Sequence, residues 1–394
     1  MARRMPGNAP ALAIALSLAL VAVACSSSDS GKGGRAARTS TSTTPAGRAP
    51  AVVFNGEGNN LNAISTVAPF KKQNVIRNHD DDPNGLDINA QICFFPDKPR
   101  RFIAGEDTNQ PNPPQGWGIF DLAGDNVGSF KATEVGKLTP TYQTATDNAE
   151  NYGCGFLRDG RVLTTDVGNQ ASGEGNGQLI VWFPPFDSRQ VRYCKLDVAI
   201  ATAGQIYVDD QDRIYVASAR PGNPSSGVQR YTGPFPTSGD AAGGCGKKDA
   251  TGAPLADSVS RERFVEAVAP ILTPNAIVPT GRGGFYVSSV FNGVIAEVDV
   301  DGKLVRTVLS PPAGETLGDQ TYSTGTPFGL GVGADGTLYY ADIGIVVRPS
   351  VGPGPKGSVR RIRFVDGAPK PPEVMADGLA FPDGIGIYQP TTRG

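Results

Sequence analysis

Carboxylate and amide side chains recur at one position of a repeated pattern in this chain of 394 residues. The stretches "DPNGLDIN", "TPNAIVPT" and "FPDGIGIY" place Asn84, Asn275 and Asp383 directly after a proline, and Asn151 in "ENYGCGFL" lies one residue before the matching position. Such oxygens are the ligands that calcium prefers in proteins. If the fold gathers these four residues, they predict a calcium site. The alternative is that each one fixes a local turn through hydrogen bonds to nearby backbone.

Three other side chains are candidates for a catalytic base. His79 is the single histidine and lies beside three aspartates in "RNHDDDPNG", and histidine is a common general base. Asp166 and Asp342 each follow a hairpin glycine by six residues, so they share one structural position. The alternatives are a solvated turn for His79 and loop-capping roles for both aspartates. A single histidine also makes zinc less expected than calcium.

The elements that must position these residues form a repeat. A strand-like run, an Asp-Gly or similar turn, and a second run rich in β-branched and aromatic residues recur at 156–166, 208–218, 279–289 and 332–342. A second pair of strands follows in most repeats, so each unit holds about four strands. The first strands begin, at intervals of 52 to 71 residues, near Asn84, Tyr152, Gly204, Asn275, Phe328 and Asp383.

Six such units predict an all-β fold, a six-bladed β-propeller over residues 50–394. The last repeat stops early and supplies only the innermost strand of the sixth blade. We expect the outer strands of that blade, which close the ring and remove its open edges, at 51–56, 61–66 and 73–78. We expect function on the face where the innermost strands begin, because the long connections fall there, at 105–116, 167–177, 220–227 and 343–357.

The "PNG", "PNA" and "PDG" stretches and the blade core "GADGTLYYADIG" resemble the gluconolactonase, senescence-marker-protein and paraoxonase group of six-bladed propellers. The chain is also similar to NHL-repeat propellers, which are often binding scaffolds. The first resemblance implies a central divalent cation, held by Glu, Asn and Asp, that polarises a lactone or ester carbonyl. It also implies that His79 is a base like the paraoxonase histidine.

The resemblance carries over to individual positions unevenly. Asn275 and Asp383 match the cation-binding positions well, whereas Asn84 and Asn151 match them less closely. The glutamate of the group has no single counterpart. Glu57 and Glu106 are both candidates for it. Two aromatic residues, Tyr152 and Phe328, stand where a cation site favours oxygen.

Residues 1–24 predict a secretory signal. Arg3 and Arg4 precede an apolar run ending in "AVAC", which resembles a bacterial lipobox, so Cys25 is the expected lipidation site. An ordinary signal peptide or a short membrane anchor is the alternative. Residues 25–49 are rich in Ser, Thr, Gly and Ala and predict a flexible tether. We therefore expect an exported protein held by lipid on the outer face of the cell membrane.

Composition limits the partners. The formal net charge is −2, or −4 once Arg3 and Arg4 are removed with the signal, so nucleic acid is not an expected partner. A monomer is expected. In an exported protein the four remaining cysteines allow two disulfides with three connectivities. The preferred pairs are Cys93–Cys154 and Cys194–Cys245, and buried free thiols are the alternative.

Two functions agree with these patterns. The first is a propeller that binds a small molecule at the channel mouth and hydrolyses a lactone or ester with calcium. The second is a non-catalytic scaffold that binds a surface protein or glycan through its long loops. The sequence has no GxSxG motif and no phosphate-binding glycine motif between a strand and a helix. With one histidine, a quinone-dependent sugar dehydrogenase is an outside alternative.

Overall fold

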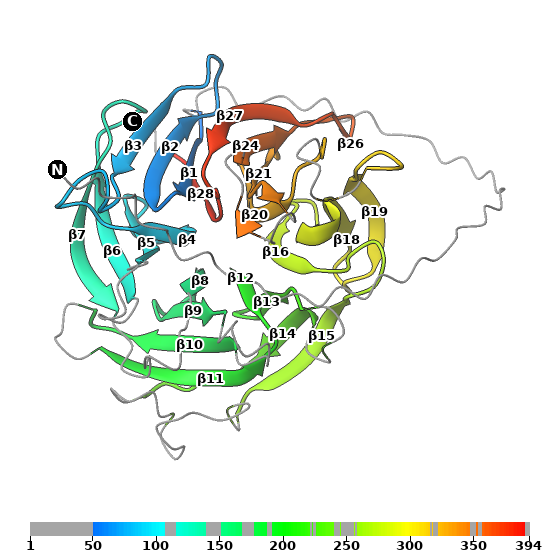
Figure 1. Ribbon diagram of the computed structural model, residues 1–394. Helices are drawn as coiled ribbons and strands as arrows, with labels where there is room; N and C mark the ends of the chain where they lie inside the picture. The colour runs from blue at the N-terminus through cyan, green and yellow to red at the C-terminus, as the bar shows by residue number, and fades with distance from the viewer. Residues whose placement is uncertain are drawn as a thin grey trace, which may run out of the picture.

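Six four-stranded antiparallel sheets surround a central axis in the computed structural model (Figure 1), which confirms the predicted six-bladed β-propeller. The structure describes residues 50–390 except 107–115, 139–150, 168–176, 187–190, 221–222, 224–225, 240–244, 246–255, 257, 316, 318–321, 347–351 and 354–356. The predicted signal, Cys25 and the tether lie outside these residues. Within them, the one helical element is a short 3-10 turn, Val290–Asn292, and no helix is long and apolar enough to cross a membrane.

Each blade runs from an innermost strand at the axis to an outermost strand at the rim. Blade 1 contains β4 (Ile88–Phe94), β5 (Arg101–Glu106), β6 (Gly116–Ala123) and β7 (Lys131–Leu138). Blade 2 contains β8 (Asn151–Phe156), β9 (Val162–Asp166), β10 (Gly177–Phe183) and β11 (Arg192–Ile200). Blade 3 contains β12 (Ala203–Val208), β13 (Ile214–Ser218), β14 (Gly227–Thr232) and β15 (Ser260–Glu266).

The remaining three blades follow the same order of strands. Blade 4 contains β16 (Pro274–Pro279), β17 (Phe285–Ser289), β18 (Val294–Val298) and β19 (Leu304–Leu309). Blade 5 contains β20 (Pro327–Val332), β21 (Leu338–Asp342), β24 (Gly357–Ile362) and β27 (Glu373–Leu379). Blade 6 contains β28 (Ile385–Tyr388), β1 (Val52–Glu57), β2 (Asn60–Ser65) and β3 (Lys72–Ile76).

Blade 6 joins the two ends of the chain, as predicted. The C-terminal strand β28 pairs antiparallel with β1, and Val52 lies opposite Tyr388. Strands from the first and last parts of the chain therefore lie side by side in Figure 1. At the junction of blades 6 and 1, the Phe54 ring packs against those of Phe94 and Tyr388, with centroids 5.3 Å and 6.2 Å away. This aromatic packing closes the ring.

Each of the six junctions between neighbouring blades has an apolar cluster of its own. The junction of blades 1 and 2, for example, contains Trp117, Ile180 and Trp182, each no more than 1% exposed. Side chains on successive residues of a strand point to opposite faces, so every sheet contributes to two clusters. The core is therefore a ring of six contacts that surrounds the axis.

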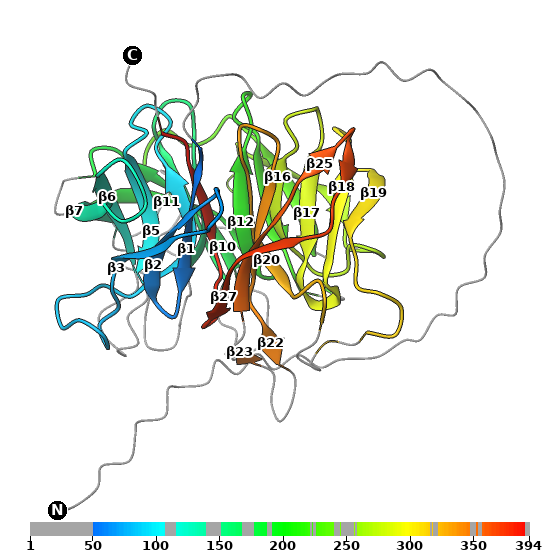
Figure 2. The ribbon, with the colours of Figure 1, turned by 90° about the horizontal axis from the view of Figure 1, so that it is seen from above.

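Two faces of the disc follow from this topology. We name the face on which the innermost strands begin the loop face, and the opposite one the hairpin face. Figure 2 shows the small sheet of β22 (Ile345–Val346) and β23 (Gly352–Pro353) projecting from the loop face. On the hairpin side, β25 (Phe364–Val365) pairs with β26 (Ala368–Pro369). Most of the long connections predicted on the loop face lie outside the described residues.

Both preferred disulfides are confirmed. The Cys93–Cys154 bond joins the innermost strands of blades 1 and 2, with Cα atoms 6.0 Å apart. The Cys194–Cys245 bond attaches β11 of blade 2 to the connection between β14 and β15 of blade 3, with Cα atoms 4.8 Å apart. Three consecutive blades are therefore cross-linked in series.

Candidate functional site

Two predicted site residues lie in an exposed turn before the first blade. The Asn84 backbone N–H donates to Asp82 Oδ1 at 3.0 Å, and the His79 backbone N–H donates to Asp87 Oδ1 at 2.9 Å. Both Asn84 and His79 are exposed. Asn84 thus lies in a turn, and the side chain that stabilises this turn is that of Asp82. A catalytic role for His79 stays a prediction.

The innermost strand of blade 1 begins later than the sequence pattern predicted. β4 starts at Ile88, and its pair nearest the hairpin is Phe94 opposite Phe102. The residue four positions before Phe94 in the chain is Ala90. Tyr152, Asn275 and Phe328 likewise lie four positions before the last paired residue of their own innermost strands, so Ala90 is their equivalent in blade 1. Placing Asn84 at this position was therefore wrong, because its Pro-Asn-Gly sequence forms a turn in the connection between β3 and β4.

Asp383 connects three blades. Its Oδ2 accepts the Ala90 N–H at 2.9 Å, and its Oδ1 accepts the Gly384 N–H at 2.5 Å. Its backbone N–H donates to Gly56 O at 3.1 Å, and its backbone oxygen accepts the Gly329 N–H at 3.1 Å. Ala90 has a left-handed backbone, φ 69°, which costs a non-glycine residue about 1–2 kcal/mol. The carboxylate of Asp383 helps to hold that conformation where the ring closes.

Asn275 is bonded to aromatic residues rather than to other oxygen ligands. Its Nδ2 donates to Tyr152 Oη at 2.8 Å and to Phe328 O at 3.3 Å. The Tyr152 and Phe328 rings meet edge to face, with centroids 4.8 Å apart, although they belong to the opposite blades 2 and 5. These rings therefore meet across the axis at the level where the resemblance implies a cation.

The contacts of the four predicted calcium ligands can now be compared with what a calcium site requires. Asn151 is buried, and its Nδ2 donates to Gly116 O at 2.6 Å. Calcium requires six to eight oxygens around one point. Asp383 instead accepts backbone N–H groups, Asn275 bonds to Tyr152, and Asn84 lies in a turn. In the described part of the chain, no three His, Cys, Asp or Glu side chains are grouped to hold a metal. The contacts of the predicted ligands do not fit a central cation.

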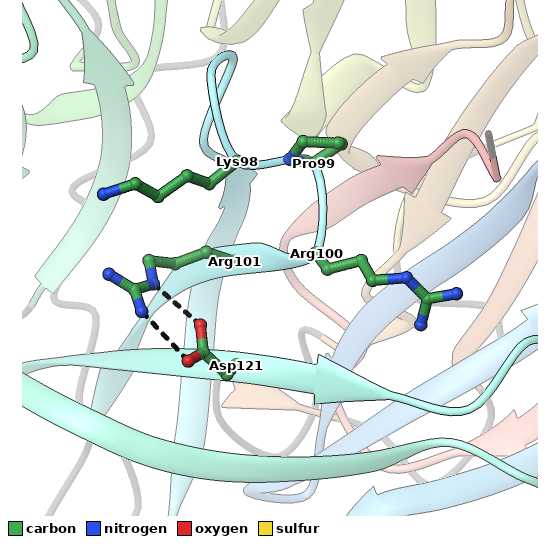
Figure 3. A pocket seen from close by; sticks show the side chains of 5 residues that line it. All are labelled: Lys98, Pro99, Arg100, Arg101 and Asp121. Carbon is green, nitrogen blue, oxygen red and sulfur yellow. Dashed lines mark hydrogen bonds and ion pairs between the residues drawn. The ribbon is translucent and has the colours of Figure 1, made fainter.

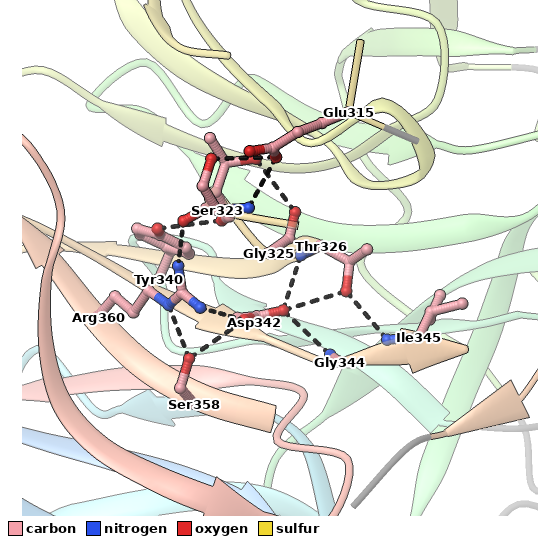
Figure 4. Close-up of polar contacts among 11 residues, drawn as sticks. Glu315, Ser323, Gly325, Thr326, Tyr340, Asp342, Gly344, Ile345, Ser358 and Arg360 are labelled. Atoms are coloured by element: carbon pink, nitrogen blue, oxygen red, sulfur yellow. Dashed lines mark hydrogen bonds and ion pairs between the residues drawn. The ribbon is translucent and has the colours of Figure 1, made fainter. Parts of the chain in front are cut away.

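Asp342 is the centre of a polar network at the loop end of blade 5 (Figure 4). Its Oδ1 accepts hydrogen bonds from the N–H and Oγ1 of Thr326, at 2.7 and 3.2 Å, and from the Gly344 N–H at 3.0 Å. Its Oδ2 accepts from Ser358 Oγ at 3.1 Å and Arg360 Nη2 at 2.9 Å. These five bonds use the acceptor sites of a buried carboxylate, and they match the loop-capping alternative for Asp342.

Other blades repeat this capping arrangement at the end of the second strand. Ser218 Oγ accepts the Thr202 N–H at 3.3 Å, and Ser289 Oγ accepts the Thr273 N–H at 2.9 Å. In blade 6, Glu57 Oε1 accepts the Ala380 N–H at 3.0 Å. In each case the acceptor fixes the connection that leads into an innermost strand. The position shared by Asp166 and Asp342 thus supports the fold in at least four blades.

Asp166 and Glu106 occupy the same position in blades 2 and 1. Asp166 is 1% exposed and lies opposite both Asn151 and Gln178 in the strand ladder; its role as a base stays a prediction. Glu106 is 2% exposed and forms an ion pair with Lys137. Its Oε1 is buried without a hydrogen-bond partner among the described residues. Glu106 therefore departs from the capping pattern of this position.

Burial also affects a phenol in the Asp342 network. Tyr340 is fully buried and its Oη donates to Thr324 O at 3.2 Å. Burial raises the pKa of the Tyr340 phenol well above its usual value. The Tyr340 phenol therefore stays protonated, and stays a hydrogen-bond donor to the backbone, further into the alkaline range than a free tyrosine.

An apolar cluster covers part of the loop face near the axis. Val290, Ile343 and Ile345 form its buried centre, and three partly buried phenylalanines pack against them, namely Phe291, Phe328 and Phe381. Phe381 has φ 50°, an unusual conformation for a bulky residue. Apolar side chains thus cover part of the channel mouth beside the polar networks, and the sequence signalled them only through Phe328.

The hairpin face has a shallow depression of about 310 Å³ beside the turn between β4 and β5. Figure 3 shows Lys98 and Arg101 on one side and Arg100 pointing away from them. Asp121 forms a double hydrogen bond with Arg101, at 2.7 and 2.9 Å, and Asp125 pairs with Arg100. The aspartates offset these positive charges, so the depression does not favour an anionic ligand.

No protein-family model and no curated protein matches the chain. Several solved structures are similar to it. One is a protein of unknown function from Bacteroides caccae, which is 11% identical in sequence and has a TM-score of 0.49; the alignment covers 86% of this chain and 99% of that chain. The calcium-binding protein regucalcin from Agrobacterium tumefaciens has 13% identity, coverages of 75% and 85%, and a TM-score of 0.43. A gluconolactonase from Xanthomonas campestris has 13% identity, coverages of 72% and 75%, and a TM-score of 0.41. At these values the similarities assign no function to this chain.

Proposed function

We propose that this chain is an exported, lipid-anchored binding protein that uses the loop face of its propeller to bind a surface protein or glycan. The observation that carries this proposal is that Asp342, Asp383 and Asn275 are hydrogen-bonded to other groups of the propeller. Each was predicted to act in catalysis or metal binding, and each makes buried bonds that connect strands or blades. Because these side chains are bonded within the fold, we place the proposed ligand site on the loop face rather than at the axis.

Two further features support export. The Cys93–Cys154 and Cys194–Cys245 disulfides suit an oxidising compartment outside the cytoplasm. The lipobox-like "AVAC" ending at Cys25, followed by the polar segment 26–49, suits a folded domain held near a membrane by lipid and a flexible chain.

The proposal is tested by binding and turnover assays on one preparation of the chain. Binding is measured on an array of defined bacterial and host glycans and with purified candidate surface proteins. The matched variant has residues 347–356 of the β22–β23 region replaced by a short Gly-Ser linker. We expect binding that the linker variant loses while its thermal unfolding is unchanged. Equal binding by both chains contradicts a role for this part of the loop face.

The calcium-dependent lactone or ester hydrolase ranks second, because its predicted ligands have other partners in the structure. Turnover of simple lactones and aryl esters is measured with calcium and with a chelator. We expect no turnover in either condition. Calcium-dependent turnover that Asp383→Asn abolishes without unfolding the chain would favour the hydrolase and overturn the proposed binding function as the main activity.

A further inference from the structure

Two glutamines cross the axis of the propeller and bond to the backbone of other blades. Gln91 of β4 accepts the N–H groups of Cys154 and Ile206, at 3.0 and 3.2 Å, and donates to Ile206 O at 3.2 Å. Gln205 of β12 accepts the Leu330 N–H at 3.0 Å and donates to Leu330 O at 2.9 Å. Both side chains are buried, with exposures of 9% and 2%.

The topology explains why amide side chains suit these positions. An innermost strand pairs with its own blade along one edge, while its other edge faces the axis and has no neighbouring strand. Buried N–H and C=O groups on that edge need partners, because leaving one unpaired costs about 1–3 kcal/mol. A glutamine amide offers one acceptor and a donor, the pair that a neighbouring strand would supply.

The contacts near the axis reach every blade. Gln91 links blade 1 to blades 2 and 3, and Gln205 links blade 3 to blade 5. Asn275 links blade 4 to blades 2 and 5, and Asp383 links blade 6 to blades 5 and 1. The inner strands also touch directly, because a Cβ at Gly204 would lie 2.5 Å from Asn275 O. Little room is left at this level of the axis.

We propose that five side chains close the axis of this propeller and hold its inner strands together without a central cation; this axial network consists of Gln91, Tyr152, Gln205, Asn275 and Phe328. The inference goes beyond the proposed function, because it concerns how the ring is closed and holds whether or not a ligand binds to the loop face. It also predicts that no ligand enters the propeller along its axis.

The test compares thermal unfolding of the purified full chain and its variants. We expect Gln91→Ala and Gln205→Ala each to lower Tm by roughly 5–10 °C, because each leaves two or three buried backbone groups unpaired. The matched control is Gln211→Ala, since Gln211 lies exposed in the turn between β12 and β13 and its Tm should not change. We expect calcium and chelator to leave the wild-type Tm unchanged, and elemental analysis to find no equivalent of calcium.

The Gln91→Glu variant gives a readout that loss of packing alone would not produce. A carboxylate still accepts the two N–H groups, but it repels Ile206 O until it is protonated. Relative to wild type, its Tm should therefore rise as the pH falls from about 8 to about 5. A pH-independent Tm difference, a wild-type Tm for Gln91→Ala, or one equivalent of calcium with a chelator-sensitive Tm each overturns the proposal. If Gln91→Ala fails to fold, the Gln91→Glu profile and the calcium content decide.

Discussion

At the level of single residues, the carboxylate of Asp383 accepts two backbone N–H groups where the ring closes. Removing it in Asp383→Ala should lower the free energy of unfolding by about 3–6 kcal/mol, because hydrogen bonds to a charged group contribute about 1.5–3 kcal/mol each and two are lost. Denaturant unfolding with and without calcium measures this. Asp377→Ala, which changes an exposed aspartate of β27, should stay within about 0.5 kcal/mol of wild type. A loss that appears only in calcium would instead assign Asp383 to a metal.

Gly325 shows how tightly the Asp342 carboxylate is enclosed. Gly325 has φ 66°, and a Cβ there would lie 2.1 Å from Asp342 Cγ. Gly325→Ala should therefore cost about 3 kcal/mol, combining left-handed strain with overpacking. Gly336 has φ 80° but no atom within 4 Å of its Cβ position, so Gly336→Ala should cost only about 1 kcal/mol. Equal losses in denaturant unfolding would contradict this account of the Asp342 site.

Asp197 predicts a pH dependence of stability. It is fully buried and accepts hydrogen bonds from Tyr231 Oη at 2.9 Å and Arg261 Nη1 at 2.7 Å. Burial raises the pKa of the Asp197 carboxyl despite these partners. The folded chain thus holds this proton to a higher pH than the unfolded chain, so its stabilising contribution is full below the unfolded pKa, about 3.9, and is lost as the pH rises through the folded pKa.

The Asp197→Asn variant isolates this titration. The difference in free energy of unfolding between wild type and variant should change as the pH rises from about 3.9 through the folded pKa, and should be constant above it. Denaturant unfolding across this range measures the difference. A difference that is constant from acid to neutral pH would show that burial leaves the Asp197 pKa unshifted.

At the level of elements, β28 is the one described strand that joins the C-terminal part of the chain to β1. Deleting residues 384–394 removes it and exposes the edge of β1, together with the apolar junctions on both sides of blade 6. We expect this truncated chain to aggregate or to lack cooperative unfolding. Deleting only 391–394 keeps β28 and should leave circular dichroism and Tm unchanged. A soluble, cooperatively folding chain without β28 would contradict its role in ring closure.

Local patterns account for the elements that the sequence predicted well. Asp-Gly turns between alternating runs located the β8–β9 and β20–β21 hairpins, because hairpin signals act over a few residues. The same logic failed before blade 1, where the Pro-Asn-Gly at Asn84 forms a turn and the strand starts at Ile88. A Pro-Asn-Gly sequence favours a turn wherever it occurs, so it does not by itself fix the register of a later strand.

Contacts across the axis had no comparable signal. Gln91 and Gln205 are 114 positions apart, and their partners become visible only when six blades close into a ring. Glu57 likewise caps Ala380, which lies 323 residues away along the chain. Tyr152 and Phe328 did give a signal in the sequence, because aromatic residues stood at two positions where a cation site favours oxygen ligands. Their ring contact is the reason for that departure.

At the level of the whole molecule, both ends of the propeller lie on the hairpin face. The first strand, β1, runs from Val52 on the hairpin face to the Glu57–Asn60 turn on the loop face. The last strand, β28, ends at Tyr388 opposite Val52. A tether that leads to Cys25 therefore joins the propeller on the hairpin face. If Cys25 carries a lipid, the hairpin face is the membrane side and the loop face is directed outward, where a surface protein or glycan is accessible.

Energy transfer to the membrane tests this orientation in lipid vesicles that carry the lipidated chain and an acceptor dye. Val67→Cys places a donor on the hairpin side, at a residue 52% exposed, and Asn84→Cys places one in the exposed turn on the loop face. The native cysteines of the described part are paired, so the added thiol is the labelled one. We expect greater transfer from position 67. If residues 26–49 form the predicted flexible tether, they would span about 25–30 Å on average, which would let the domain tilt while attaching it by one face. Equal transfer from both positions, or greater transfer from position 84, would mean that the loop face does not point away from the membrane.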